Sequence, residues 1–322
     1  MIKRKIYFRA DASPSIGYGH FIRTLALADM LKSNFECTFF TQSPTDYQLE
    51  QVAMVCPIVA LPSDDNRFDL FLSYLTGDEI VVLDNYFYTT EYEKQIKIKG
   101  SKLVCIDDMH NRHYYADVII NQGIISEEQY SKELYTRLCH GFDWLLLRAP
   151  FLNNIECPIF NIRKNKVIFS FGGSDMYNLS SKVANILEQE KIQSIGIIGD
   201  GFRGNIENYK YVDFKTKISA QEVADLFSCS EYAILPASTM CLEAIACGVK
   251  LLMGYYVDNQ KEFSDYMGNN GYSYNLGNMT LNCFEDTIIK VLRKITYGGI
   301  SLPNTKFVGG IKERYVNLFY NL

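Results

Sequence analysis

The chain has 322 residues, a mass of 36.9 kDa and a formal net charge of −5 at pH 7. Because single domains usually run to about 100–200 residues, this length predicts two domains. With 48% hydrophobic and 21% charged residues, the composition is that of a soluble globular protein. The net negative charge and the lack of a long basic run argue against nucleic acid, and against stable membrane association, as interactions of this chain.

The cysteines number nine and are scattered, with neither a Cys-x-x-Cys pair nor a zinc-like spacing. An odd count of this kind is consistent with reduced thiols. The N-terminal segment lacks the long apolar core of a secretion signal, and no apolar run approaches the roughly 20 residues of a transmembrane helix. We therefore expect a cytoplasmic protein.

Strand and helix patterns alternate along the first half of the chain. The apolar run at residues 6–8 predicts a first strand, and the segment from Leu25 to Leu31 predicts a first helix. Further strands are predicted over residues 36–42, 80–84, 102–106 and 117–120, with helical segments near 44–55 and 89–99. This alternation is typical of parallel sheets covered by helices on both faces.

The turn between the first strand and the first helix carries two glycines and a histidine. Gly17 and Gly19 allow backbone N–H groups to approach a ligand closely, and the start of the helix favours anions. His20 is expected at the positive end of the helix dipole, which opposes protonation and favours a neutral imidazole able to accept a proton. The turn thus predicts a functional site.

The pattern restarts in the second half. A polar stretch ending near residue 166 precedes a new strand at residues 167–171, which leads into a glycine-rich turn and a further helix. We predict two doubly wound, Rossmann-type domains, residues 1–150 and 151–322, which face one another across a cleft. The segment from residue 304 to the C-terminus predicts a helix, and the sequence leaves open the domain on which it packs.

The glycine-rich turn at residues 172–175 is a candidate phosphate site. Gly172 and Gly173 offer backbone N–H groups, and Ser174 offers a hydroxyl. An ordinary strand-to-helix turn explains this piece equally well.

A second candidate lies at the start of the helix predicted over residues 240–247. Ser238 and Thr239 there are either N-caps or phosphate ligands. Glu243, one turn further on, either accepts the two hydroxyls of a ribose or is a solvated helix residue. Asn259 follows the next predicted strand and is placed to contact a sugar or phosphate, or to cap a helix.

Carboxylates end two strands of the first half. Asp84 ends one strand, and Asp107 and Asp108 end the next. They are candidates for substrate contact, although N-capping is the slightly favoured interpretation. His110 and His113 nearby resemble part of a metal site, but no partner at the usual spacing completes it, so we expect no metal.

These residues together resemble a known family, the UDP-2,4-diacetamido-2,4,6-trideoxy-β-L-altropyranose hydrolases of pseudaminic acid biosynthesis. That family is related to GT-B glycosyltransferases, among them the N-acetylglucosaminyltransferase that completes the peptidoglycan lipid precursor. The resemblance extends over nearly the whole chain. Its most specific block joins residues 8–13 to the glycine-histidine turn and Arg23. Asn85 and Phe87 depart from the family pattern, beside the sugar pocket that the resemblance implies.

The resemblance implies a GT-B-like fold with the active site between the domains. His20 matches the catalytic histidine of the family, Gly173 and Ser238 match positions near the diphosphate, and Glu243 matches a ribose ligand. The candidate sugar-binding residues are Gly17, Gly19, Arg23, Asp84, Tyr86 and Asn259. The candidate UDP-binding residues are Gly172, Gly173, Ser238, Thr239 and Glu243.

The function expected on this basis is hydrolysis of a UDP-linked diacetamido-trideoxy sugar. Water attacks the anomeric carbon with inversion, His20 acts as general base, and UDP leaves; the partners are the UDP-sugar and water, with no cofactor. Two alternatives stay open. One is a GT-B glycosyltransferase that uses a UDP-sugar donor, and the other is a catalytically inert subunit that binds a nucleotide sugar.

Overall fold

The computed structural model describes residues 3–12, 17–123, 125–157, 165–173, 175–199, 202–206, 209–297 and 307–322. Ser13, at the end of the block of residues 8–13, and Ser174 of the glycine-rich turn lie outside the described residues. The chain divides into two units. Unit 1 comprises Met1–Ala149 and Val308–Leu322, and unit 2 comprises Pro150–Phe307.

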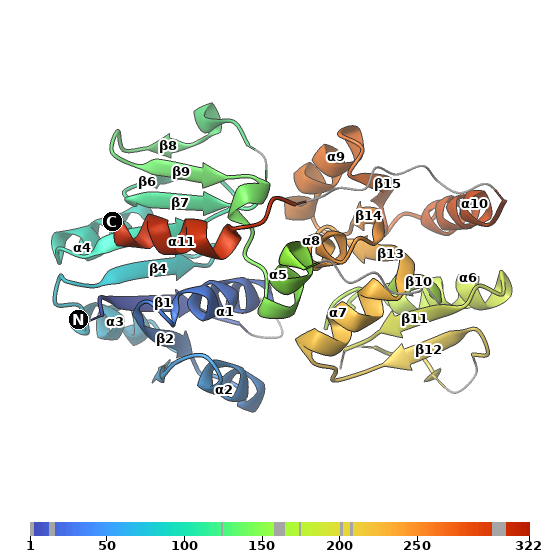
Figure 1. The fold of residues 1–322 in the computed structure, drawn as a ribbon, viewed down its shortest axis with the longest axis horizontal. Helices are drawn as coiled ribbons and strands as arrows, with labels where there is room; N and C mark the ends of the chain where they lie inside the picture. The colour runs from blue at the N-terminus through green and yellow to red at the C-terminus, as the bar shows by residue number, and fades with distance from the viewer. Residues whose placement is uncertain are drawn as a thin grey trace. The chain divides into compact units, whose positions relative to one another are not determined.

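Unit 1 is built on a seven-stranded sheet whose strands all pair in parallel, in the order β3-β2-β1-β4-β5-β7-β9 (Figure 1). The strands are β1 (Lys5–Ala10), β2 (Glu36–Gln42), β3 (Ile58–Leu61), β4 (Ile80–Asp84), β5 (Lys102–Ile106), β7 (Val118–Asn121) and β9 (Arg137–His140). A separate pair consists of β6 (His113–Tyr114) and β8 (Ser131–Lys132). Every residue of β4 and β7 is buried, as is typical of parallel strands covered on both faces.

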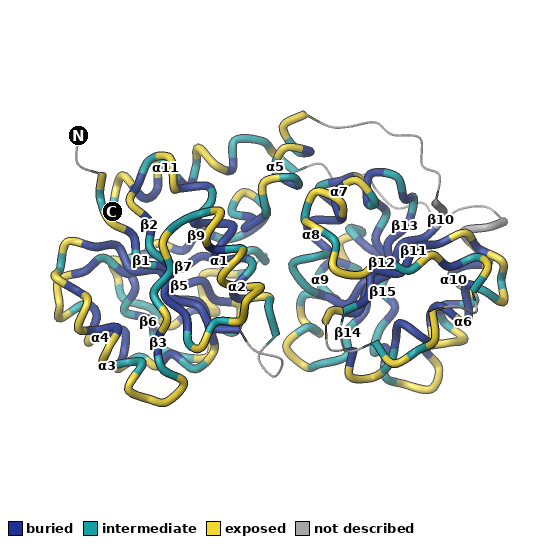
Figure 2. The backbone as a smooth tube through the Cα atoms, turned by 90° about the horizontal axis from the view of Figure 1, so that it is seen from below, coloured by how far each residue is buried: buried dark blue, intermediate teal, exposed yellow. Residues whose placement is uncertain are grey.

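Helices cover both faces of this sheet. They are α1 (Gly19–Leu31), α2 (Asp46–Ala53), α3 (Asn66–Ser73) and α4 (Thr90–Ile98). Phe39 of β2 contacts Phe21 of α1, whereas the next residue, Phe40, contacts Phe71 of α3. Because successive residues of a strand point to opposite faces, α1 and α3 lie on opposite faces of the sheet. The buried strands between them form the core of the unit (Figure 2).

The C-terminal helix α11 (Ile311–Tyr320) belongs to unit 1 and packs on α1. The hydroxyl of Tyr315 donates a 2.7 Å hydrogen bond to the carbonyl oxygen of Trp144, and Phe319 packs against Phe35 just after α1. The predicted second domain, residues 151–322, therefore ends too late. Its last helix is held by aromatic contacts with unit 1, which the amphipathic pattern of the helix does not reveal.

Unit 2 is built on a six-stranded sheet, again with all strands parallel, in the order β12-β11-β10-β13-β14-β15. The strands are β10 (Asn165–Phe169), β11 (Ser194–Ile197), β12 (Val212–Lys215), β13 (Ser230–Pro236), β14 (Lys250–Tyr255) and β15 (Ser273–Asn278). The helices are α5 (Ala149–Glu156), α6 (Leu179–Gln189), α7 (Ala220–Ser228), α8 (Thr239–Ala246), α9 (Lys261–Asn269) and α10 (Phe284–Tyr297). A core of apolar side chains from β10, β13, α6 and α10 holds the unit together.

The predicted doubly wound α/β architecture is confirmed in both units. In unit 1 the strand order reverses direction between β1 and β4, and in unit 2 it does so between β10 and β13. Ligands of such folds bind at the carboxyl ends of the strands at this switch point. The turns after β1, β4, β10 and β13 are therefore the places to look for a site.

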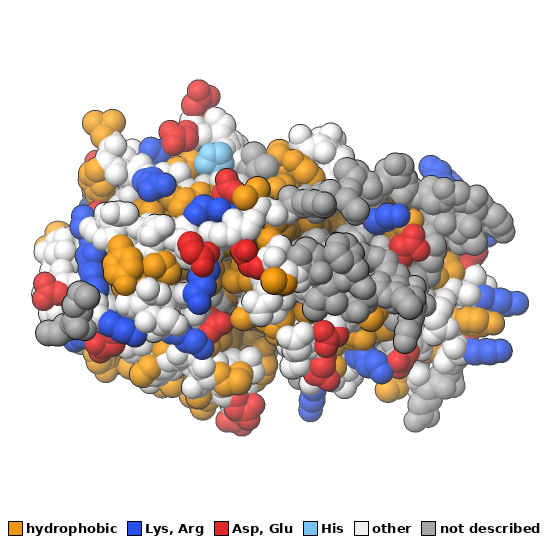
Figure 3. Space-filling view, viewed as in Figure 1, with side chains coloured by type: hydrophobic (Ala, Val, Ile, Leu, Met, Phe, Trp, Pro, Cys, Tyr) orange, Lys and Arg blue, Asp and Glu red, His pale blue; other side chains and the backbone are white. Residues whose placement is uncertain are grey.

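The described helices include none with the length and apolar character needed to span a bilayer. On the face that Figure 3 shows, acidic and basic side chains are interspersed over unit 1. This mixture agrees with the modest net charge of −5.

Candidate active site

His20 lies at the start of α1, directly after the turn that follows β1. The helix begins at Gly19, and its N-cap residue, Tyr18, makes no side-chain capping bond. Gly17 has a φ of +84°, a conformation that L side chains rarely adopt. No atom lies within 4 Å of the position that a Cβ would take at Gly17 or Gly19. The backbone of this turn is thus open to close approach by a ligand.

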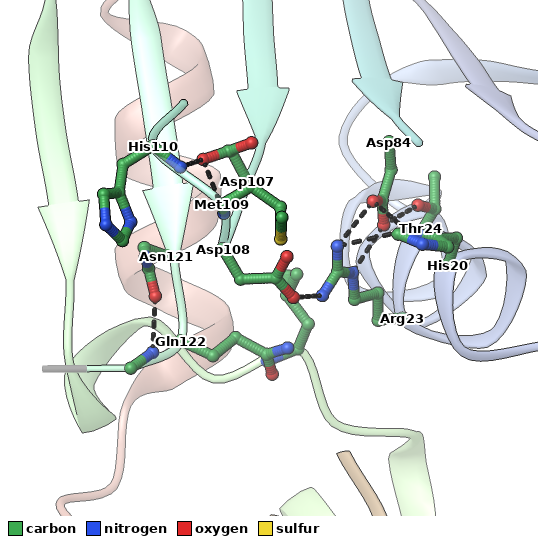
Figure 4. Close-up of polar contacts among 12 residues, drawn as sticks. His20, Arg23, Thr24, Asp84, Asp107, Asp108, Met109, His110, Asn121 and Gln122 are labelled. Carbon is green, nitrogen blue, oxygen red and sulfur yellow. Dashed lines mark hydrogen bonds and ion pairs between the residues drawn. The ribbon is translucent and has the colours of Figure 1, made fainter. Parts of the chain in front are cut away.

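The imidazole of His20 is held by Asp84, the last residue of β4. Nδ1 lies 2.7 Å from Oδ1 of the carboxylate, and both side chains are buried (Figure 4). Nη2 of Arg23 also approaches Nδ1, at 3.2 Å. An ionised carboxylate only accepts hydrogen bonds, so the shorter contact with Asp84 assigns the proton to Nδ1. Nε2 is left as the acceptor nitrogen, and the described part of the chain places no hydrogen-bond partner on it. Tyr86 is 42% exposed, and its ring is nearly perpendicular to that of His20, with the two ring centroids 4.5 Å apart.

Arg23 connects this pair to the next strand. Its Nε and Nη2 donate to the two oxygens of Asp84, each at 2.6 Å, and its Nη1 donates to Asp108 at 2.8 Å (Figure 4). Thr24 adds a hydroxyl donor to Asp84 at 2.9 Å. Burial raises the pKa of the Asp84 carboxyl, but Arg23 and His20 outweigh this effect and lower that pKa to about 2. Asp84 is thus a permanent anion at neutral pH.

The ion pair between Arg23 and Asp84 changes the role that we expect for these two residues. Arg23 and Asp84 are expected from the sequence to bind the sugar, but both side chains are buried and bond to one another. Asp108, which accepts a hydrogen bond from Arg23, is more accessible to solvent, since its side chain is 41% exposed. The geometry favours Arg23 and Asp84 as residues that position His20.

We expect the low pKa of Asp84 to make the free energy of unfolding depend on pH. The pKa is about 2 in the folded chain, against an ordinary value of 3.8 for an aspartate side chain. The native state is therefore stabilised above pH 4, and this contribution, roughly 2 kcal/mol, is lost as the pH falls toward 2. Urea unfolding of the wild type and of Asp84→Asn between pH 5 and pH 2 tests the prediction. An equal slope for both proteins would show that other carboxylates cause the dependence.

Asp107 and Asp108 differ in their surroundings. The carboxylate of Asp107 accepts the backbone N–H groups of Met109 at 3.1 Å and His110 at 2.8 Å, and the hydroxyl of Tyr130 at 3.1 Å. It shapes the turn after β5, and since the described residues between β5 and β6 begin no helix, the slightly favoured interpretation of Asp107 as a helix N-cap is wrong. Asp108 instead reaches Arg23.

Two supporting residues were missed in the sequence. Thr24 contacts Asp84 from the same face of α1 as His20 and Arg23, and the spacing i, i+3, i+4 is the signal that would have found it. Asn85 accepts the N–H of Asp11 at 2.7 Å and donates to its carbonyl oxygen at 3.2 Å. It thereby joins the turn after β1 to the end of β4.

The two candidate phosphate turns of unit 2 differ in whether a side chain caps the helix that follows. Asp175 caps α6, since its carboxylate accepts the N–H groups of Leu179 at 2.8 Å and Ser180 at 3.0 Å. These donors of α6 are thus taken by an acidic side chain. At α8 the N-cap residue is Ser238, and its side chain makes no capping bond. The N–H of Cys241 already donates to the carbonyl oxygen of Ser238 at 3.0 Å. The start of α8 therefore offers an anion the hydroxyl of Ser238 and the backbone N–H groups of the residues before Cys241.

Glu243 lies within α8 and is only 2% exposed. The alternative of a solvated helix residue is therefore wrong. Asn259 lies in the short 3₁₀ helix Asp258–Gln260 after β14 and is exposed.

The candidates fall into two groups, one on each unit. Unit 1 brings together Gly17, Gly19, His20, Arg23, Asp84 and Tyr86 at the carboxyl ends of β1 and β4. Unit 2 brings Gly172, Gly173, Ser238, Thr239, Glu243 and Asn259 to the ends of β10, β13 and β14. Both groups flank a switch point of their sheet. No group of three or more His, Cys, Asp or Glu residues suited to a metal ion occurs in the described ranges.

The curated proteins to which this chain is similar include a UDP-sugar hydrolase and a protein of polysaccharide biosynthesis. No protein-family model matches it. It is 26% identical over 278 residues to the UDP-2,4-diacetamido-2,4,6-trideoxy-β-L-altropyranose hydrolase of Campylobacter jejuni, an alignment that covers 83% of this chain and 97% of that protein. It is 24% identical over 282 residues to the spore coat polysaccharide biosynthesis protein SpsG of Bacillus subtilis, covering 83% of this chain and 82% of SpsG.

The solved structures establish the fold. MurG of Acinetobacter baumannii superimposes with a TM-score of 0.65 at 9% identity over 99% of this chain and 100% of MurG. HepE of Anabaena in complex with UDP-glucose superimposes with a TM-score of 0.62 at 10% identity, over 99% of this chain and 100% of HepE. The GT-B fold and the resemblance to the hydrolase are thus confirmed, and together they support a role in the chemistry of UDP-linked sugars.

Proposed function

We propose that this protein is a hydrolase that cleaves a UDP-linked 2,4-diacetamido-2,4,6-trideoxyhexose to UDP and the free sugar. The sugar is of the kind used to make pseudaminic acid. The proposal rests on one observation above all, the 2.7 Å contact between Nδ1 of His20 and the buried carboxylate of Asp84. A buried carboxylate contacts Nδ1 and thereby assigns Nε2 as the proton acceptor, on a residue at the start of α1. The similarity to the Campylobacter jejuni hydrolase supports the choice of substrate.

His20 is the general base in this mechanism. Nε2 takes a proton from a water molecule while the water oxygen attacks the anomeric carbon, and such assistance contributes about 10²–10⁴-fold to the rate. Asp84 keeps the imidazole in the required tautomer and stabilises the imidazolium that forms. Arg23 holds Asp84 in place through two hydrogen bonds. The partly exposed ring of Tyr86 packs beside His20 and is assigned to contact the sugar.

Unit 2 binds the leaving group. We assign the diphosphate to the uncapped start of α8, where Ser238 and Thr239 lie, and to the backbone of Gly172 and Gly173. Fixed N–H donors there stabilise the negative charge that grows on UDP as the glycosidic bond breaks. We assign Glu243 to the ribose, and Asn259 on its exposed turn to the sugar.

Turnover in ¹⁸O-labelled water tests the reaction. Attack at the anomeric carbon is expected to place the label in the sugar, with inversion at that carbon, and to leave UDP unlabelled. Mass spectrometry of both products and NMR of the newly formed sugar read the result. Label in UDP would mean attack at phosphorus and would overturn the proposed mechanism.

The same assay separates the rival functions. The GT-B fold also serves glycosyl transfer, so the UDP-sugar is supplied first without any acceptor. A hydrolase releases UDP at its full rate under these conditions, whereas a glycosyltransferase requires an acceptor. Tight UDP binding without turnover in either condition would indicate an inert binding subunit.

A further inference from the structure

Tyr256 reaches the glycine turn of unit 2 from a neighbouring strand. It follows β14, which is separated from β10 only by β13 in the sheet. Its hydroxyl oxygen lies 4.0 Å from the position that a Cβ would take at Gly172. The ring thus passes across the carboxyl end of β13 and brings a phenol to the turn after β10.

The surroundings of Tyr256 hold this ring in place. It packs against the apolar core of unit 2, and its centroid lies 5.9 Å from that of Tyr177. Its backbone N–H donates to the side-chain oxygen of Gln260 at 3.1 Å. A phenol held this way loses little conformational freedom when it makes one more hydrogen bond.

The hydroxyl of Tyr256 is available as a donor. The side chain of Gln260 donates to the oxygen of this hydroxyl, whereas no hydrogen bond donated by the hydroxyl occurs among the described residues. The N–H groups of Gly172 and Gly173 make no backbone hydrogen bond in the same part of the chain. Burial raises the pKa of Tyr256, Gln260 lowers it and Asp175 raises it, with a net rise that keeps the phenol protonated at neutral pH. The carboxylate of Asp175 already accepts two N–H groups of α6.

These groups make a set of unused donors around an open turn. No atom lies within 4 Å of the position that a Cβ would take at Gly173, so a ligand has room to approach its backbone. A phenol and two backbone N–H groups suit a ligand that only accepts hydrogen bonds, and phosphate oxygens are such acceptors.

We propose that Tyr256 is a further ligand of the UDP diphosphate, and that its hydroxyl donates a hydrogen bond to a phosphate oxygen bound at Gly172 and Gly173. This inference rests on the proposed function, because it takes the ligand to be UDP. It predicts that Tyr256 contributes to recognition of the phosphates and not of the uracil or ribose.

Calorimetry with the variant Tyr256→Phe tests this role, with UDP and uridine as ligands. Removal of a hydrogen bond to a charged group is expected to raise the Kd for UDP about tenfold or more. The Kd for uridine is expected to stay unchanged, since uridine has no phosphate. The melting temperature of the free protein should change little, because the only hydrogen bond that the hydroxyl makes with the described residues is the one it accepts from Gln260.

Tyr177→Phe is the matched control, since it removes a phenol hydroxyl from the adjacent ring. That variant should bind UDP like the wild type. An unchanged Kd for UDP in Tyr256→Phe overturns the inference, as does an equal loss of affinity for UDP and uridine. If the wild type itself does not bind UDP, the proposed function fails and the assignment of Tyr256 fails with it.

Discussion

Replacement of His20 by alanine is expected to lower kcat by about 10²-fold or more, because the variant has no group to take the proton of the attacking water. UDP should bind with nearly wild-type affinity, since its assigned ligands belong to unit 2 whereas His20 belongs to unit 1. Steady-state kinetics of UDP release, together with calorimetry of UDP binding, measure the two effects separately.

His113→Ala is the control for this variant. His113 lies on β6 of the same unit, its side chain is 38% exposed, and it contacts Ser131 and Glu133. It should keep full activity. Free imidazole added to His20→Ala should restore part of the rate if a missing base is the defect. A near-normal kcat in His20→Ala would show that another group activates the water.

Much of the fold is predictable from local pattern. The predicted strands at residues 36–42, 80–84 and 102–106 coincide with β2, β4 and β5, because buried parallel strands are short continuous apolar runs. The short pair β6 and β8 and the edge strand β9 were not predicted. Each is short, and the charged Lys132 and Arg137 interrupt the apolar pattern there.

The unit on which α11 packs could not be predicted from local pattern. The sequence predicts a helix at the C-terminus, but its apolar face would fit either unit. The choice is made by aromatic partners such as Phe35 and Trp144, which are far from the helix in sequence. Only tertiary packing brings these residues to Tyr315 and Phe319.

For the site, the sequence identifies residue types at strand ends but not their pairing. His20 and Asp84 are 64 residues apart, and the adjacency of β1 and β4 is what joins them. The same limit applies in unit 2. Asp175 and Ser238 both follow strands, yet one caps its helix and the other does not. The side-chain hydrogen bonds of Asp175 close the start of α6 to an anion, whereas the start of α8 has no side-chain cap.

Replacement of Asp84 by asparagine is expected to be nearly as severe as loss of the histidine. A carboxamide places an N–H₂ donor where Arg23 and His20 both now find acceptors. Nδ1 then becomes the acceptor, Nε2 carries the proton, and the base is lost. A change of tautomer of this kind lowers kcat about 10⁴-fold in serine proteases, and we expect a loss of about 10²–10⁴-fold here.

The same variant should also lose stability, because Arg23 keeps only Asp108 as an anionic partner. Breaking a buried ion pair on one side costs about 3–5 kcal/mol of unfolding free energy. The double variant Arg23→Gln/Asp84→Asn removes the uncompensated charge and should recover most of that loss in urea unfolding. Its kcat should stay low, since the tautomer of His20 is not restored. Recovery of activity together with stability would show instead that Asp84 only supports the fold.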